Sequence, residues 1–240
     1  MVHLSRMDLQ NISKRVLRKY MNLPDIRGKE IYRIDPMLLA TEAVGLDIDY
    51  AHLSYDGALL GLTSFSESIA CVLDEDLGPL VYTLDGNTIL IESDLKMDFS
   101  QRGRLHFTVA HETAHQVLNK LFPHDYENKP HIHCYSVKNE RTPPAVTDWE
   151  EWQANVLASY LLMPKELVMK GMYLCDLPKK IHCLNRIYSP QVYRQFETLA
   201  DLLGTSKKAL AVTLKRYGLL DKEYLQNPQS LLDIEMEVTA

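Results

Sequence analysis

The chain has 240 residues, of which 46% are apolar and 24% are charged, an ordinary composition for a globular protein with a substantial core. Its formal net charge of −6 argues against a protein dominated by binding to nucleic-acid phosphates, because that class shows a clear basic surface. Direct nucleic-acid binding is therefore not expected. No apolar run is long enough to span a bilayer, so no membrane partner is expected either.

The N-terminal residues and the cysteines bear on the cellular compartment. The first twenty residues are charged and lack the apolar centre of a secretory signal. The four cysteines follow no framework spacing; they are Cys71, Cys134, Cys175 and Cys183. Because thiols stay reduced in a chain that is not exported, we expect free cysteines and a cytoplasmic protein.

The first half of the chain predicts helices followed by strands. Apolar residues at helical spacing indicate a helix within residues 1–22, and residues 36–44 indicate a second helix that ends at Gly45. An alternating strand should follow Gly45, and residues 58–92 predict a run of strands. The Asp85-Gly86 dipeptide suits a tight turn, so we expect a hairpin there. Its second strand could accept an extended peptide as an added strand.

The second half of the chain is predominantly helical by pattern, from about Ser100 almost to the end. Residues 123–145 are the exception, because they are polar and hold four prolines, which predicts an irregular loop. Residues 199–220 resemble a helix-turn-helix with its turn at Gly204. Together the elements predict an α+β protein, in which a small, mostly antiparallel sheet packs on helices.

One predicted helix, over residues 106–118, carries the pattern H-E-x-x-H. Residues four apart lie on one face of a helix, so His111 and His115 can direct two imidazoles to a single point. Imidazole nitrogen is a good ligand for Zn²⁺, which makes water acidic enough to act as a nucleophile at neutral pH. Glu112 follows the first histidine, where its carboxylate can take a proton from water as a general base. The motif therefore predicts a catalytic zinc site.

A catalytic zinc site of this kind needs a third protein ligand and an open position. The predicted helix from Thr147 to Met163 is the best source. Glu151 and Asn155 share one of its faces, so Glu151 can bind the metal while Asn155 hydrogen-bonds a ligating histidine. Glu150 lies about 100° away around the helix, and spacing alone does not exclude it. Zn²⁺ is the expected ion, although a His/His/Glu site also admits Mn²⁺ or another divalent metal.

The stretches RLHFTVAHETAHQVL and EEWQANVLASYLLMP together resemble the ImmA/IrrE family of metallopeptidases. The family signature is an F-T-x-A-H-E-x-x-H helix followed by an E-x-x-A-N helix that ends in L-M-P, and the resemblance is strongest over residues 79–164. It implies a gluzincin-like fold in which the ligand glutamate is Glu151 rather than Glu150. It also implies an endopeptidase that cleaves a helix-turn-helix repressor at one site and so releases gene expression.

The resemblance also suggests how the chain is divided. We expect a metallopeptidase domain over residues 1–170, and a helical C-terminal segment over residues 171–225 that packs on it. Residues 226–240 form an acidic tail with little pattern.

Two features depart from the family pattern. Ala114 stands where the family usually has glycine, but both residues are small, so close packing is kept. The loop between the two motifs is long and contains His124, His131, His133 and Cys134. His131 and His133 are candidate transition-state donors. A second metal site and a lid are two other interpretations, but the one that we favour is a solvated loop that happens to contain histidines.

The main rival is a DNA-binding regulator whose metal site is structural or vestigial. It depends on the basic second helix of the helix-turn-helix, which carries Lys207, Lys208, Lys215 and Arg216. The acidic net charge disfavours this rival, and lysine, alanine and threonine are poorly suited to reading bases. A purely structural zinc site would need a fourth protein ligand, and only three are evident in the sequence. An aminopeptidase would need a group that holds the substrate's free amine, and the sequence shows no obvious candidate for it.

Overall fold

The computed structural model describes residues 3–74, 78–125 and 149–230, together with the backbone of residues 132–136. The chain forms two compact units, Met1–Leu162 and Met163–Ala240. No helix within the described residues is both long enough and apolar enough to cross a bilayer.

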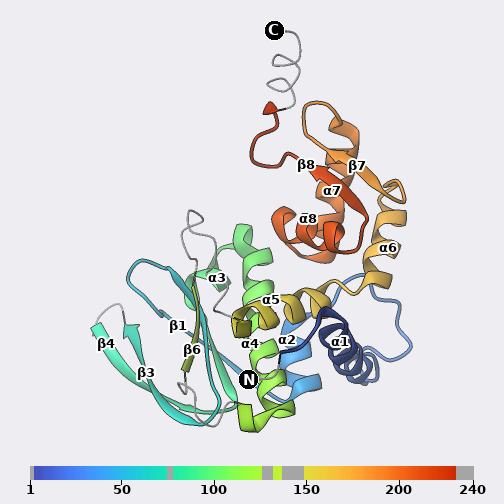
Figure 1. Cartoon of the computed structure of the whole chain (residues 1–240). Coiled ribbons are helices and arrows are strands. Elements are labelled where there is room, and N and C mark those ends of the chain that lie inside the picture. Colours follow the sequence, from blue (N-terminus) through green and yellow to red (C-terminus); the bar gives the residue numbers. More distant parts are fainter. Residues whose placement is uncertain (1–2, 75–77, 126–131, 137–148, 231–240) are drawn as a thin grey trace. The chain divides into compact units, whose positions relative to one another are not determined.

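The first unit combines helices with strands, which confirms the predicted α+β class (Figure 1). Its described helices are α1 (Arg6–Met21), α2 (Pro36–Leu38), the π-helix η1 (Leu39–Val44), α3 (Ser93–Met97), the 3-10 helix η2 (Phe99–Gln101), α4 (Arg102–Leu121), the 3-10 helix η3 (Pro123–Asp125) and α5 (Trp149–Leu162). Its described strands are β1 (Asp47–Ala51), β2 (Leu59–Ser64), β3 (Glu67–Asp74), β4 (Gly78–Asp85), β5 (Thr88–Glu92) and β6 (Ile132–Ser136).

Four of these strands form one mixed sheet in the order β1-β5-β2-β6. β1 runs parallel to β5, whereas β2 is antiparallel to both β5 and β6, so the sheet is mostly antiparallel as predicted. β3 and β4 form a separate antiparallel ribbon.

The hairpin predicted at Asp85-Gly86 is wrong, although the turn itself is present. Gly86 has a φ of 83°, and the Asp85 carboxylate accepts hydrogen bonds from the backbone N–H groups of Asn87 and Thr88. The strands on either side pair elsewhere, because β4 pairs with β3 while β5 lies between β1 and β2. The side chains of β5 are largely apolar and are buried on both faces, which favours a central position for this strand in the sheet. With a neighbour on each side, β5 cannot accept the extended peptide that the sequence suggested.

The core of the first unit lies on both faces of β5. Successive residues of a strand point to opposite faces. Ile89 and Ile91 accordingly pack with apolar residues of η1, α3 and α4, whereas Leu90 packs with residues of the β3–β4 ribbon. All three side chains are fully buried, which favours folding by about 1.5–3 kcal/mol each.

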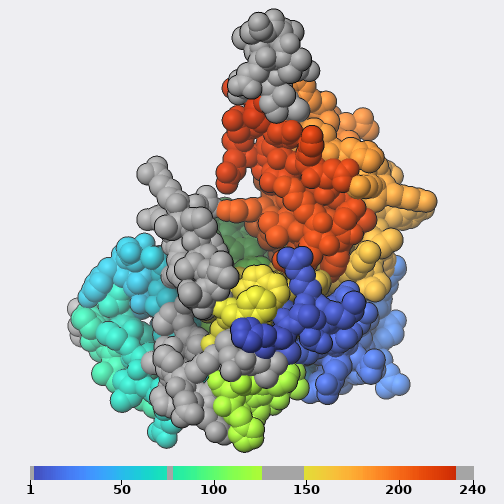
Figure 2. Space-filling model, in the orientation of Figure 1, coloured from blue at the N-terminus to red at the C-terminus, as the bar shows by residue number. Residues whose placement is uncertain are grey.

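The N-terminal helix α1 covers part of this unit and packs against α5. Figure 2 shows α1, in blue, beside α5, in yellow. A capping box formed by Ser5 and Asp8 starts the helix, and its buried face includes Leu9, Val16 and Tyr20. The Tyr20 hydroxyl accepts a hydrogen bond from the backbone N–H of Asp35, which fastens the chain just before α2.

Strand β6 corrects the prediction of a wholly irregular loop over residues 123–145. It pairs with β2 over residues 132–136, with His133 opposite Thr63. The polar composition concealed this strand. The neighbouring segments 126–131 and 137–148 lie outside the described residues, as does the predicted cap at Thr147.

The second unit contains α6 (Lys165–Leu174), β7 (Ile181–Leu184), α7 (Pro190–Leu203), α8 (Lys207–Arg216) and β8 (Leu220–Glu223). α7 and α8 flank a turn at Gly204, whose φ of 66° confirms the predicted position of that turn. The short parallel pair of β7 and β8 was not predicted. Of the predicted tail, residues 231–240 lie outside the described part.

Candidate metal centre

Helix α4 carries the predicted histidine pair into the interior of the first unit. It packs against β2 and β5 and also against α5. Small side chains at Ala110 and Ala114 permit this close packing, and both are fully buried. As a result the side chains of His111 and His115 are only 0% and 1% exposed. Buried imidazoles need polar partners, so the surroundings of these rings decide their function.

Three side chains from two helices converge at this point. The Nε2 atoms of His111 and His115 lie 3.0 Å apart, and the two rings meet edge to face at 78°. Glu151 of α5 contacts both nitrogens through different oxygens. Its Oε2 lies 3.1 Å from Nε2 of His111, and its Oε1 lies 3.1 Å from Nε2 of His115. Within the described residues, these three side chains form a buried His/His/Glu group of the kind that could hold a metal ion.

The donor separations fit a divalent metal ion. Ligands at about 2.0–2.1 Å from a tetrahedral zinc ion lie about 3.3 Å apart, close to the distances observed between these donors. Two imidazoles and one carboxylate also make a donor set that suits Zn²⁺ and several other divalent ions. The residues therefore fit the predicted group, with three protein ligands.

Glu151 rather than its neighbour Glu150 takes part in this group. The side chain of Glu150 is buried but does not join the two histidines. The Glu151 side chain is 25% exposed, whereas the histidines are almost completely enclosed. Solvent therefore reaches the group on the side of Glu151.

The ionisation of the group follows from its burial and its internal contacts. Burial opposes the charge of Glu151, but hydrogen bonds from His111 and His115 outweigh that penalty and lower the pKa of its carboxyl group. Burial lowers the pKa of His115, although Glu151 opposes this effect. Ionised carboxylate and neutral imidazole are the forms that bind a metal.

Glu112 lies next to His111 on α4 and is completely buried. Neither of its carboxylate oxygens has a hydrogen-bond partner among the described residues. Burial, followed by the negative charge of Glu151, raises the pKa of Glu112 well above its ordinary value. A buried carboxyl group without a partner is costly, and a bound cation nearby would offset that cost. Glu112 therefore places a buried carboxyl group, without a hydrogen-bond partner among the described residues, next to His111.

Gly61 of β2 makes room for Glu112, and it is not among the site residues predicted from the sequence. A Cβ atom at this position would lie 2.6 Å from Oε1 of Glu112 and 2.7 Å from Cγ2 of Thr108, too close for either. The β2–β6 pairing is irregular between Leu59 and Gly61, and such irregularities are frequent next to active sites. A glycine inside an apolar strand is the signal that could have revealed this close approach.

A buried glutamine fixes α4 against the sheet one residue beyond His115. The Gln116 Nε2 group donates to the Thr63 hydroxyl at 2.8 Å and to the Ser64 carbonyl at 2.6 Å. Because both acceptors belong to the end of β2, this contact sets the position of the histidine pair relative to Gly61.

The remaining predicted site residues are less closely tied to the group. Within the described part of the chain, the Asn155 side chain makes no hydrogen bond to either histidine, so its supporting role stays a prediction. His133 lies on β6, next to β2, and its side chain is not described. His131 falls outside the described residues. The proposed role of these two histidines as transition-state donors therefore stays a prediction.

Comparison with known proteins found no matching family model and no similar curated sequence. The resemblance to the ImmA/IrrE family accordingly depends on the two motifs and on their convergence in space. What the structure supports directly is a buried His111/His115/Glu151 group, compatible with a metalloenzyme.

Proposed function

We propose that the protein is a metal-dependent endopeptidase. The observation that carries this proposal is the convergence of His111, His115 and Glu151 beside the unpartnered carboxyl group of Glu112. A site built only to hold an ion needs no such extra acid. An enzyme that hydrolyses peptide bonds needs one, because protons must move to and from the reacting atoms.

Each of these residues has a distinct task in the proposed reaction. His111, His115 and Glu151 would hold a divalent ion, which supplies Lewis acidity that polarises a peptide carbonyl and makes water a better nucleophile. Glu112 takes a proton from a water molecule as the oxygen of that water attacks the carbonyl carbon. It then delivers that proton to the amide nitrogen as the C–N bond breaks. Glu112 is thereby ionised again, and one water molecule is consumed for each bond cleaved.

We propose a helix-turn-helix transcriptional repressor as the substrate, cleaved at a single site in the cytoplasm to release gene expression. The support for this substrate class is the resemblance of the two helical motifs to those of ImmA/IrrE proteins.

The rival, a DNA-binding regulator, has less support from the second unit. Lys207 of α8 pairs with Glu197 at 2.8 Å, and Lys215 pairs with Glu223 at 3.2 Å. Two of the four basic side chains that would contact phosphates are thus already paired with acids. A gel shift with salt titration tests this rival, because affinity for nucleic acid must fall steeply with salt.

Chelation followed by reconstitution tests the proposed function. The purified protein is treated with a chelator, dialysed, and given Zn²⁺ or Mn²⁺ before incubation with a purified helix-turn-helix repressor. We expect cleavage at one position, seen by mass spectrometry, that chelation abolishes and one of the ions restores. Cleavage that is indifferent to chelation would contradict metal dependence.

A further inference from the structure

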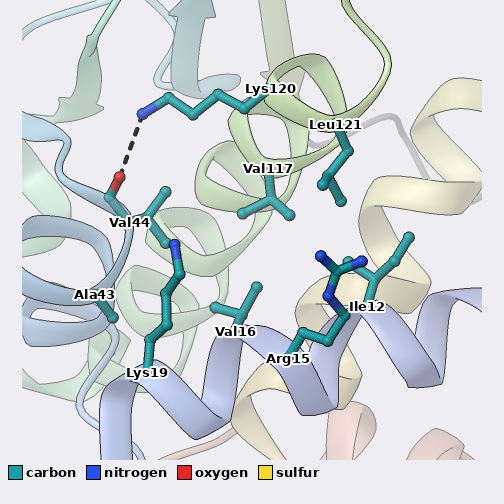
Figure 3. A pocket seen from close by; sticks show the side chains of 9 residues that line it. All are labelled: Ile12, Arg15, Val16, Lys19, Ala43, Val44, Val117, Lys120 and Leu121. Carbon is teal, nitrogen blue, oxygen red and sulfur yellow. Dashed lines mark hydrogen bonds between the residues drawn. The ribbon is translucent and has the colours of Figure 1, made fainter. Parts of the chain in front are cut away.

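A pocket lies in the first unit, between α1, η1 and the last turns of α4 (Figure 3). Its volume is about 130 Å³, and the residues that line it are Ile12, Arg15, Val16, Lys19, Ala43, Val44, Val117, Lys120 and Leu121. None of these residues belongs to the metal group or to its immediate supports.

The lining divides into an apolar floor and a cationic rim. Ile12, Val16 and Val117 are buried members of the floor, while Leu121 remains 40% exposed at its edge. Three cations and no acids complete the lining. Figure 3 shows the side chains of Arg15 and Lys19 extending from α1 toward α4 and η1. A ligand that matches this surface has an apolar body and a negatively charged end.

The three cations are not neutralised by the described parts of the protein. Lys120 Nζ donates to the Val44 carbonyl at 3.3 Å and to the Asn87 side-chain oxygen at 3.2 Å, both uncharged acceptors. Neither Arg15 nor Lys19 forms an ion pair with a carboxylate within the described residues. Burial, together with the positive charge of Lys19, lowers the pKa of Lys120. Lys19 and Lys120 therefore repel one another, and an anion beside them would relieve that repulsion.

The backbone beside the pocket is unusual as well. Ala43 and Val44 belong to the π-helix η1, in place of the ordinary helix that the sequence predicted over residues 36–44. π-helical turns are rare, and they occur often at functional sites. The π-helix is independent of the cationic side chains, and it also indicates a functional site at this pocket.

We propose that this pocket binds a small amphipathic carboxylate. Its alkyl chain lies on the floor formed by Ile12, Val16 and Val117, and its carboxylate lies at the cationic rim beside Arg15 and Lys19 of α1. Arg15 offers the planar fork that matches a carboxylate, and the two lysines add positive charge. A pocket of about 130 Å³ accepts only a small ligand, so the part of the ligand that it holds is a short alkyl chain.

Calorimetric titration with hexanoate tests this proposal on the full-length protein. We expect saturable binding with a dissociation constant on the order of 0.1–1 mM, as for other small ligands of this size. Affinity should rise from acetate through butyrate to hexanoate, because each added methylene contacts the floor. Hexanol, which has the same chain without the charge, should bind at least about fivefold more weakly. These measurements do not depend on peptidase activity, so they are independent of the proposed function.

Charge-matched variants show whether binding occurs at this pocket. Arg15→Gln and Lys19→Gln should each weaken hexanoate binding about three- to tenfold. Lys14→Gln is the control, because Lys14 is exposed on α1 next to Arg15, is absent from the lining and changes the net charge equally. It should bind hexanoate within about twofold of the parent. The proposal is overturned if hexanol binds as well as hexanoate, if Lys14→Gln weakens binding as much as Lys19→Gln, or if no saturation is seen.

Discussion

Replacing Gly61 by alanine should disable Glu112 while leaving the metal group in place. The added Cβ would lie 2.6 Å from Oε1 of Glu112, whereas ordinary contact begins at 3.4 Å, so the carboxylate must move by about 0.8 Å (3.4 minus 2.6). Thr108 closes the other side, with its Cγ2 at 2.7 Å from the new atom. A misplacement of about 1 Å in a catalytic group costs about 100-fold in rate. Overpacking should also lower the free energy of unfolding by about 1–3 kcal/mol.

The assay is cleavage of the repressor by Gly61→Ala and by the parent, each at a matched metal content. We expect about 100-fold slower cleavage by the variant, with one metal ion per chain in both proteins. A double-mutant cycle supplies the control, because Gly61→Ala should cause no further loss of activity in a Glu112→Gln background.

Either of two results would contradict this role of Gly61. Cleavage by Gly61→Ala within about threefold of the parent would mean that the position of Glu112 does not limit the reaction. A large further loss in the Glu112→Gln background would mean that the alanine acts through another part of the site.

Three further predictions concern the ligand, the support of the helix and a surface tyrosine. Glu151→Gln should lose most of the bound metal while Glu150→Gln keeps it, as measured by metal analysis of both purified proteins. The opposite result would mean that Glu150, and not Glu151, is the metal ligand. Gln116→Leu should lower the free energy of unfolding by about 1–3 kcal/mol in urea, because buried acceptors on β2 lose their donor; an unchanged midpoint would contradict this. Burial, and then a hydrogen bond to Asp49, raise the pKa of Tyr82 to about 12, so its contribution to stability is present below about pH 10 and is lost as the pH rises toward 12. Tyr82→Phe should therefore show a smaller loss of stability than the parent between pH 10 and 12, and equal losses would contradict the assignment.

The parts of the site that follow from helical periodicity could be predicted from the sequence. A spacing of four residues places His111 and His115 on one face of α4, and this requires only that the segment be helical. The facing position of Glu151 was harder, because spacing left Glu150 as an alternative. The convergence of α4 and α5 decides between them in the structure.

The features that depend on distant parts of the chain could not be predicted in this way. The turn at Gly86 was recognised from local chemistry, but the partner of each adjoining strand depends on burial across the whole sheet. The role of Gly61 requires knowing that Glu112, some fifty residues later, lies against it. The π-helical form of residues 39–44 is equally hidden, because an apolar helical pattern does not distinguish it from an ordinary helix.

Comparison of Glu112→Gln with the parent distinguishes an enzyme from a protein that only holds metal. Glutamine has nearly the same shape as glutamate but cannot carry the proton. We expect the variant to fold normally, to retain one metal ion per chain and to cleave the repressor at least about 100-fold more slowly, since general acid–base catalysis contributes about 10²–10⁴-fold. Undiminished cleavage by the metal-loaded variant, measured beside the parent by mass spectrometry, would contradict this expectation.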